Sequence, residues 1–231
     1  LTIISKMLKA KIKMPNGQHL HFLDDMPFTV GEVVTATVDV KNRDLTRCNH
    51  SSAHLLQKAL QTVLGSHVHQ HGSQVSSEYC RFDFNNFNSL TEEQILKIED
   101  LVNESINGSH EVKTPVMTID EAKQSGAMAL FDEKYGDSVR VVTMGNVSKE
   151  FCGGTHVANT QEIGVFKIVS EESIGSGIRR MTTRTKLAAY HDFVERENSL
   201  RSISEMLKMN SINGVEEKVQ GVIDDNAALR K

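Results

Sequence analysis

The sequence predicts an α+β protein in which a small N-terminal β-barrel precedes an α/β domain and a C-terminal helix. Three observations indicate this order. Residues 1–45 carry turn signals and β-rich runs, residues 46–186 alternate between helical and strand patterns, and residues 187–231 return to a helical period. We therefore expect domains at 1–45, 46–186 and 187–231.

Short strands are expected in the first of these ranges. Pro15-Asn16-Gly17 is a hairpin turn signal, and the β-rich run from Val33 to Val40 follows the turn residues Met26-Pro27 and Gly31. Because no helical pattern separates these strands, we expect them to form a small barrel.

The second range begins with a helix. Apolar residues at three- and four-residue steps predict a helix over 46–64, and Gly65 is well placed to end it. A second helix is expected over 92–107, because Thr91 and Gln94 form a capping box at its start. Strands are expected at 66–72, 78–85, 112–119, 138–144, 163–170 and 177–185, with a short helix after Asp120. A final helical stripe runs from Leu187 to about Met209.

The composition describes a soluble globular chain. Its 231 residues include 39% apolar and 24% charged residues, and no apolar run approaches the ~20 residues that span a bilayer. No signal peptide is visible, and three cysteines do not suggest a disulfide framework, so we expect a cytoplasmic protein without a membrane partner. The missing first Met and the charged, helix-like C-terminal end suggest a piece of a longer protein.

Two short motifs have the spacing of metal ligands. His50 and His54 are four residues apart on a predicted helix, so both imidazoles project from one face. Cys152 and His156 flank a Gly-Gly pair that permits a tight turn. Three nitrogens and one sulfur suit zinc, which prefers four ligands in a tetrahedron. We therefore predict a Zn²⁺ site from these four residues.

The role of this zinc stays open on the residues alone. Four protein ligands favour a closed structural site, since a catalytic zinc usually keeps one position free. The surrounding domain, however, is large enough to have its own core, and small domains need a metal most. The usual metalloprotease pattern is excluded, because Ser51 occupies the position that holds the glutamate of the H-E-x-x-H motif.

Several motifs resemble a known family, the alanyl-tRNA synthetases of bacterial type. Residues 49–56 and 151–156 are similar to the two metal motifs of their editing domain, which is related to the free-standing AlaX-type editing proteins. The segments RFDF (81–84), GAMALF (126–131) and GIRR (177–180) also resemble that family, in its order. The likeness runs from about Arg47 to Thr185, and residues 1–45 are similar to the small barrel that precedes the editing domain.

The resemblance implies that the zinc site hydrolyses Ser-tRNA(Ala) and Gly-tRNA(Ala), which are tRNAs charged with the wrong amino acid. It implies partners, namely the acceptor end of tRNA(Ala) carrying serine or glycine and the remaining domains of a full-length, ATP-binding ligase of protein biosynthesis. No aminoacylation is expected from this chain, because it shows none of the residues for ATP binding. The zinc could activate a water or only position the ester.

The resemblance also points to Gln70 as the residue that recognises serine. A pocket that sorts by size could not admit serine while excluding alanine, so the serine hydroxyl should be recognised by hydrogen bonding, and an amide can both donate and accept. Without the resemblance, a solvent-facing strand glutamine would be preferred. His67, His69 and His71 should share the opposite face of the strand.

Other catalytic roles are less defined. Asp83 is a possible base but is more simply a structural hydrogen-bond acceptor. The Gly153 and Gly154 amides could stabilise an oxyanion, or the glycines could only permit the turn.

Basic residues gather in two places. Arg179, Arg180 and Arg184 are expected to contact the tRNA acceptor end, whereas Lys6, Lys9, Lys11 and Lys13 could equally form a solvated strand edge.

Two rival interpretations remain at this point. One is a free-standing AlaX-type deacylase that acts on tRNA in trans. The other is a non-catalytic tRNA-binding module in which the zinc is structural.

Overall fold

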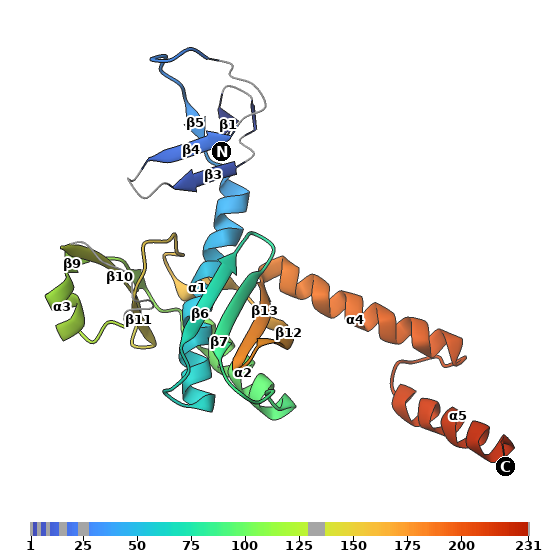
Figure 1. The fold of residues 1–231 in the computed structure, drawn as a ribbon. Helices are drawn as coiled ribbons and strands as arrows, with labels where there is room; N and C mark the ends of the chain where they lie inside the picture. Colours follow the sequence, from blue (N-terminus) through green and yellow to red (C-terminus); the bar gives the residue numbers. More distant parts are fainter. Residues whose placement is uncertain are drawn as a thin grey trace.

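The computed structural model describes residues 2–3, 6–7, 10–13, 18–22, 28–128 and 137–230. It is an α+β fold built around a four-stranded antiparallel sheet in the order β12-β13-β7-β6. Helices α1 (Val40–Leu64) and α2 (Glu92–Asn107) pack against each other and against this sheet (Figure 1). The α+β class that the sequence predicts is therefore confirmed.

The central sheet follows the predicted hairpins. Its strands are β6 (Gln70–Val75), β7 (Cys80–Asn85), β12 (Phe166–Gly175) and β13 (Ile178–Thr185). Every second residue of β7 and β13 is buried, as expected for strands with one covered face. The apolar residues among them join the apolar faces of α1 and α2 in the main core, with Phe82, Phe84, Leu56, Leu60, Ile98 and Met181 fully buried.

A second small sheet lies beside the first. Strand β10 (Ser138–Met144) pairs with β11 (Ser148–Phe151), β8 (Val112–Lys113) and β9 (Val116–Thr118). Ala122 of helix α3 (Ile119–Gln124) is part of a second, small hydrophobic core with Val139 and Val141 of β10. A 3₁₀ turn, η1 (Thr160–Ile163), then leads the chain back to β12.

The N-terminal strands that the structure describes do not close into a barrel. Strand β1 (Thr2–Ile3) pairs with β2 (Lys6–Met7) and β5 (Ala36–Thr37), while β3 (Ala10–Lys13) pairs with β4 (His19–Phe22). These are two separate sheets, and β1, β2 and β5 have only two residues each. The predicted turns Pro15-Asn16-Gly17 and Met26-Pro27 lie outside the described residues.

The predicted strand over 33–40 is largely wrong. Only Ala36–Thr37 forms a strand, and α1 begins at Val40, ahead of the predicted start at residue 46. The cause is Asp39, whose carboxylate accepts the backbone N–H of Asn42 at 2.9 Å and caps the helix. The helix therefore crosses the expected boundary between residues 45 and 46, and the three domain ranges stay a prediction.

The C-terminal helices lead away from the central sheet (Figure 1). Helix α4 (Lys186–Met206) starts directly after β13, close to the predicted position, and α5 (Val215–Leu229) follows after a short turn. None of the helices in the described part of the chain has both the length and the apolar character that a membrane crossing requires.

Candidate metal centre

Four side chains from distant parts of the sequence meet between α1 and the loop after β11. His50 and His54 project from α1, Cys152 directly follows β11, and His156 lies four residues further along the loop. Their ligand atoms all lie within 4.8 Å of one another. The structure therefore brings together all four residues that the sequence predicts as metal ligands.

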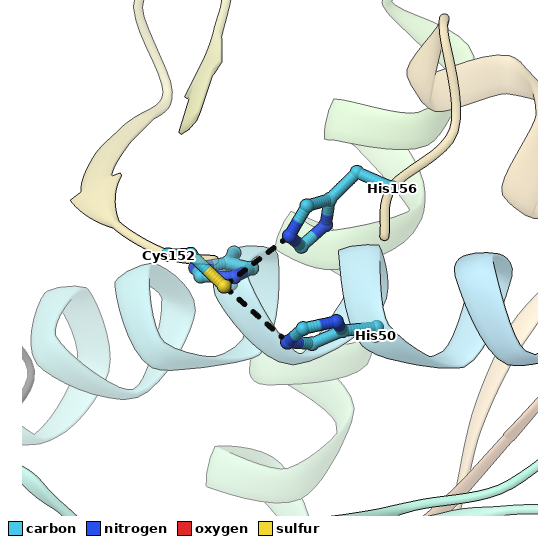
Figure 2. A group of neighbouring side chains, drawn as sticks. His50, Cys152 and His156 are labelled. Carbon is cyan, nitrogen blue, oxygen red and sulfur yellow. Dashed lines mark hydrogen bonds between the residues drawn. The ribbon is translucent and has the colours of Figure 1, made fainter. Parts of the chain in front are cut away.

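The distances within this cluster suit a zinc ion. Cys152 Sγ is 3.3 Å from His156 Nε2 and 3.6 Å from His50 Nε2 (Figure 2). Sulfur and nitrogen ligands of a tetrahedral zinc lie about 3.5 Å apart, given Zn–S and Zn–N bonds of about 2.3 and 2.0 Å. The donor set of one thiolate and three imidazoles is also typical of zinc.

His54 carries a buried polar atom that no described residue satisfies. Its Nε2 is buried and has no hydrogen-bond partner among the described residues. A buried polar atom without a partner is costly, and a metal ion at the cluster would satisfy it. This orphaned nitrogen is the strongest structural sign that the four residues hold a metal.

The ring nitrogens of His54 and His156 that face away from the cluster each contact another side chain. His54 Nδ1 hydrogen-bonds to the carboxylate of Glu150, which is buried and also accepts the hydroxyl of Ser148 at 2.9 Å. His156 Nδ1 lies 3.2 Å from the Oγ of Ser51. Such outer contacts fix the ring orientation of metal-binding histidines.

The protonation of Cys152 and His156 also suits metal binding. Burial alone would raise the pKa of the Cys152 thiol, but hydrogen bonds from His156 and His50 outweigh it and lower the pKa to about 3. Burial is the main cause that lowers the pKa of His156 to about 4. Cys152 is thus a thiolate and His156 a neutral imidazole at neutral pH, which are the forms that bind zinc. Burial opposes the charged form of His54, yet the Glu150 carboxylate raises its pKa to about 10. A metal ion would therefore displace a proton from His54 when it binds.

The Gly-Gly loop is shaped by contact with His50. A Cβ placed on Gly154 would lie 2.0 Å from His50 Cε1, whereas a Cβ on Gly153 would meet nothing within 4 Å. The Gly154 N–H faces Cys152 Sγ at 3.5 Å, so it is directed at the sulfur ligand. The close approach of the backbone to His50 is a further reason for a glycine at 154, beside the two interpretations that the sequence offered.

Arg140 holds the same loop from the neighbouring strand. Its guanidinium donates to the backbone carbonyls of Cys152, at 2.9 Å, and Gly154. Because β10 and β11 are paired, the loop that carries two ligands is attached to a rigid sheet.

Gln70 lies at the start of β6 and is half-buried. Its side-chain amide donates to Ser73 Oγ, within the same strand, at 3.0 Å. The expected alternation of His67, His69 and His71 is incomplete, because β6 begins only at Gln70 and a register shift separates Gln70 from Gly72. The role of Gln70 in serine recognition stays a prediction.

The three arginines predicted to contact tRNA all have acidic partners within the chain. Arg180 forms a two-pronged ion pair with Asp83 at 2.7 and 2.8 Å. Arg179 pairs with Glu171 across the β12–β13 hairpin, and Arg184 pairs with Asp192 of α4. Asp83 is therefore engaged as a structural acceptor, as the simpler interpretation of that residue expected.

Sequence reasoning missed Glu150, Ser51 and Arg140. Glu150 left a usable signal, because it stands two residues before a ligand cysteine on a strand, and metal-binding histidines commonly donate to a carboxylate. Ser51 lies within the first motif, but nothing in its spacing indicates a contact with His156. Arg140 gives no local signal, since its partners are backbone carbonyls twelve and fourteen residues away.

Comparisons with known proteins place the cluster in a wider context. Residues 139–182 match the family model described as the threonyl and alanyl tRNA synthetase second additional domain, and this match includes Cys152 and His156. Over 227 residues the chain is 48% identical to alanine–tRNA ligase 1 of Lachnoclostridium phytofermentans. This match covers 95% of the chain and 26% of that protein.

Two further relatives are also alanine–tRNA ligases. The chain is 46% identical over 220 residues to an alanine–tRNA ligase of Streptococcus pneumoniae, with 95% of this chain and 25% of that protein covered. It is 43% identical over 209 residues to an alanine–tRNA ligase of Lactobacillus acidophilus, with 90% and 24% covered. The chain thus spans about a quarter of the length of the curated relatives it matches.

Proposed function

The chain is homologous over 95% of its length to bacterial alanine–tRNA ligases, and from this premise we propose that it is their editing segment. It hydrolyses the ester of Ser-tRNA(Ala) and Gly-tRNA(Ala) and so removes amino acids that were attached in error. The single observation that carries the proposal is the cluster of His50, His54, Cys152 and His156, with its orphaned buried nitrogen.

The same four residues would hold a zinc ion. When bound, this ion supplies a Lewis acid beside the ester. The chain's own residues do the rest. Ser51 and Glu150 orient two of the imidazoles, and Arg140 fixes the loop that carries Cys152 and His156.

The reaction itself is a balanced hydrolysis. The oxygen of water forms a bond to the ester carbonyl carbon, and the bond between that carbon and the ribose oxygen breaks. The ribose oxygen takes one proton of the water, so the products are the free amino acid and the uncharged tRNA. Asp83 is not assigned as the base, because both of its oxygens are held by Arg180.

A separate hydrolytic site has a physical justification. Serine and glycine each differ from alanine by one small group, and an apolar pocket separates such ligands by only about 1–3 kcal/mol. A second site that recognises the error after attachment multiplies this selectivity.

The proposal includes partners and a location. The acceptor end of tRNA(Ala) is the substrate, and the remaining domains of the ligase, which bind ATP and charge the tRNA, act beside this segment in the cytoplasm. Arg179, Arg180 and Arg184 contact the phosphates of the acceptor end. Because each is paired within the chain, this contact requires sharing or exchange of its carboxylate partner.

A deacylation assay tests the proposed function. We expect the purified chain to contain zinc and to release serine from Ser-tRNA(Ala) while leaving Ala-tRNA(Ala) intact. Removal of the metal with a chelator should abolish the release, and added Zn²⁺ should restore it. A chain that binds zinc and tRNA but releases no serine at any enzyme concentration would instead be a binding module with a structural zinc.

Gln70→Ala tests the recognition of serine. We expect kcat/KM for Ser-tRNA(Ala) to fall by up to about tenfold relative to Gly-tRNA(Ala), because one neutral hydrogen bond is worth about 0.5–1.5 kcal/mol. Gln74→Ala, at an exposed position of the same strand, is the matched control. If the ratio of serine to glycine release is the same in both variants, Gln70 does not recognise the hydroxyl.

A further inference from the structure

We infer that Glu150 is a positioning residue of the metal centre, a role that rests on the proposed function of the cluster. Glu150 lies on β11, two residues before Cys152, and is only 2% exposed. One carboxylate oxygen accepts the Nδ1–H of His54, and the other accepts the hydroxyl of Ser148. Both of its oxygens are therefore fixed.

The contact between Glu150 and His54 fixes the tautomer of the neutral imidazole that would bind a metal. An imidazole with its proton on Nδ1 presents a free lone pair on Nε2. In this structure Nε2 is the atom that is buried without a partner among the described residues. Because the carboxylate holds the Nδ1 proton, the ring keeps both its tautomer and its rotation, and Nε2 stays directed at the cluster.

Glu150 also balances charge in a buried place. A Zn²⁺ ion brings two positive charges, the Cys152 thiolate contributes one negative charge, and the three histidines are neutral when they bind a metal. The Glu150 carboxylate supplies the second negative charge. Uncompensated charge inside a protein is expensive, so its removal should weaken the metal site more than the loss of one neutral hydrogen bond.

The two outer contacts differ in chemistry. His156 is held by the hydroxyl of Ser51, which carries no charge and also accepts the backbone N–H of Val157 at 3.2 Å. Of these two contacts, the one with His54 combines orientation with a negative charge. We therefore expect Glu150 to contribute more to the metal affinity than Ser51 does.

Glu150→Gln keeps the shape of the side chain and removes its charge. We expect the variant to bind Zn²⁺ about 10–100-fold more weakly than wild type, as measured by competition with a chelator of known affinity. The increase in Tm that saturating Zn²⁺ produces should shrink correspondingly, because stabilisation by a ligand follows its Kd. Glu111→Gln is the matched control, since Glu111 is exposed and forms an ion pair with Lys113, which is exposed as well.

These readouts separate positioning from a merely structural role. If Glu150 only stabilises the fold, its replacement lowers the Tm of the metal-free protein but leaves the Zn²⁺ affinity and the Zn²⁺-induced increase unchanged. A Kd within about twofold of wild type would therefore overturn the inference. The wild-type deacylation assay is independent of this result, so the inference can fail while the proposed function stands. Ser148→Ala, which leaves the carboxylate in place, should weaken zinc binding less than Glu150→Gln.

Discussion

Replacing Cys152 with alanine should remove zinc from this protein under conditions in which wild type retains one ion per chain. Cys152 supplies the only sulfur of the cluster and a negative charge, and its Sγ lies 3.3 and 3.6 Å from two imidazole nitrogens. Apparent binding free energies of about 10–16 kcal/mol are shared by the four ligands of a structural zinc. We therefore expect the affinity to fall on the order of a hundredfold or more, and serine release to fall with it.

Metal analysis after dialysis against a weak chelator measures this effect. Cys48→Ala is the matched control, because Cys48 is a buried cysteine of α1 whose thiol donates to the Glu162 carbonyl. The control should keep its zinc. A Cys152→Ala protein that still holds one zinc per chain would remove Cys152 from the site.

Gly154→Ala should also have a large effect, although it adds only one methyl group. That methyl would lie 2.0 Å from His50 Cε1 and 2.5 Å from His50 Nδ1. Neither the loop nor the helix can yield easily, because Arg140 holds the loop and α1 is packed in the core. His50 must therefore rotate away, and a displacement of about 1 Å at a reacting centre can cost about a hundredfold in rate.

Gly153→Ala provides a close control for this prediction. A Cβ at Gly153 meets nothing within 4 Å, so the same methyl is added to the same loop without a clash. We expect wild-type zinc affinity and serine release from Gly153→Ala, and a loss of both by about tenfold or more from Gly154→Ala. Equal behaviour of the two variants would show that the close approach of Gly154 to His50 does not govern the metal centre.

Local patterns predicted much of the fold correctly. Helix α2 occupies the predicted range, 92–107, and its capping box between Thr91 and Gln94 is present. Both hairpins of the central sheet also formed. These features depend on contacts between residues close in sequence, which a pattern can indicate without knowledge of the rest of the chain.

The errors occur where a local signal competes with another. The β-rich run ending at Val40 contains Asp39, and its cap on Asn42 started α1 inside the predicted strand. Strand β6 began at Gln70 rather than residue 66, and its register shift removed the alternation that had grouped the three histidines. Strand preference depends on context, so it was overridden in both places.

The sequence by itself predicted the donor set of the candidate centre. Two histidines one helical turn apart, and a cysteine and a histidine around two glycines, indicate candidate ligands by their chemistry and spacing alone. Only the tertiary structure decided what surrounds these ligands. Glu150 behind His54, the absent Cβ at Gly154 and the acidic partners of the three arginines all depend on contacts that no spacing rule predicts. The physical reason is that donor chemistry belongs to each side chain, whereas orientation, charge balance and close approach arise when distant segments pack together.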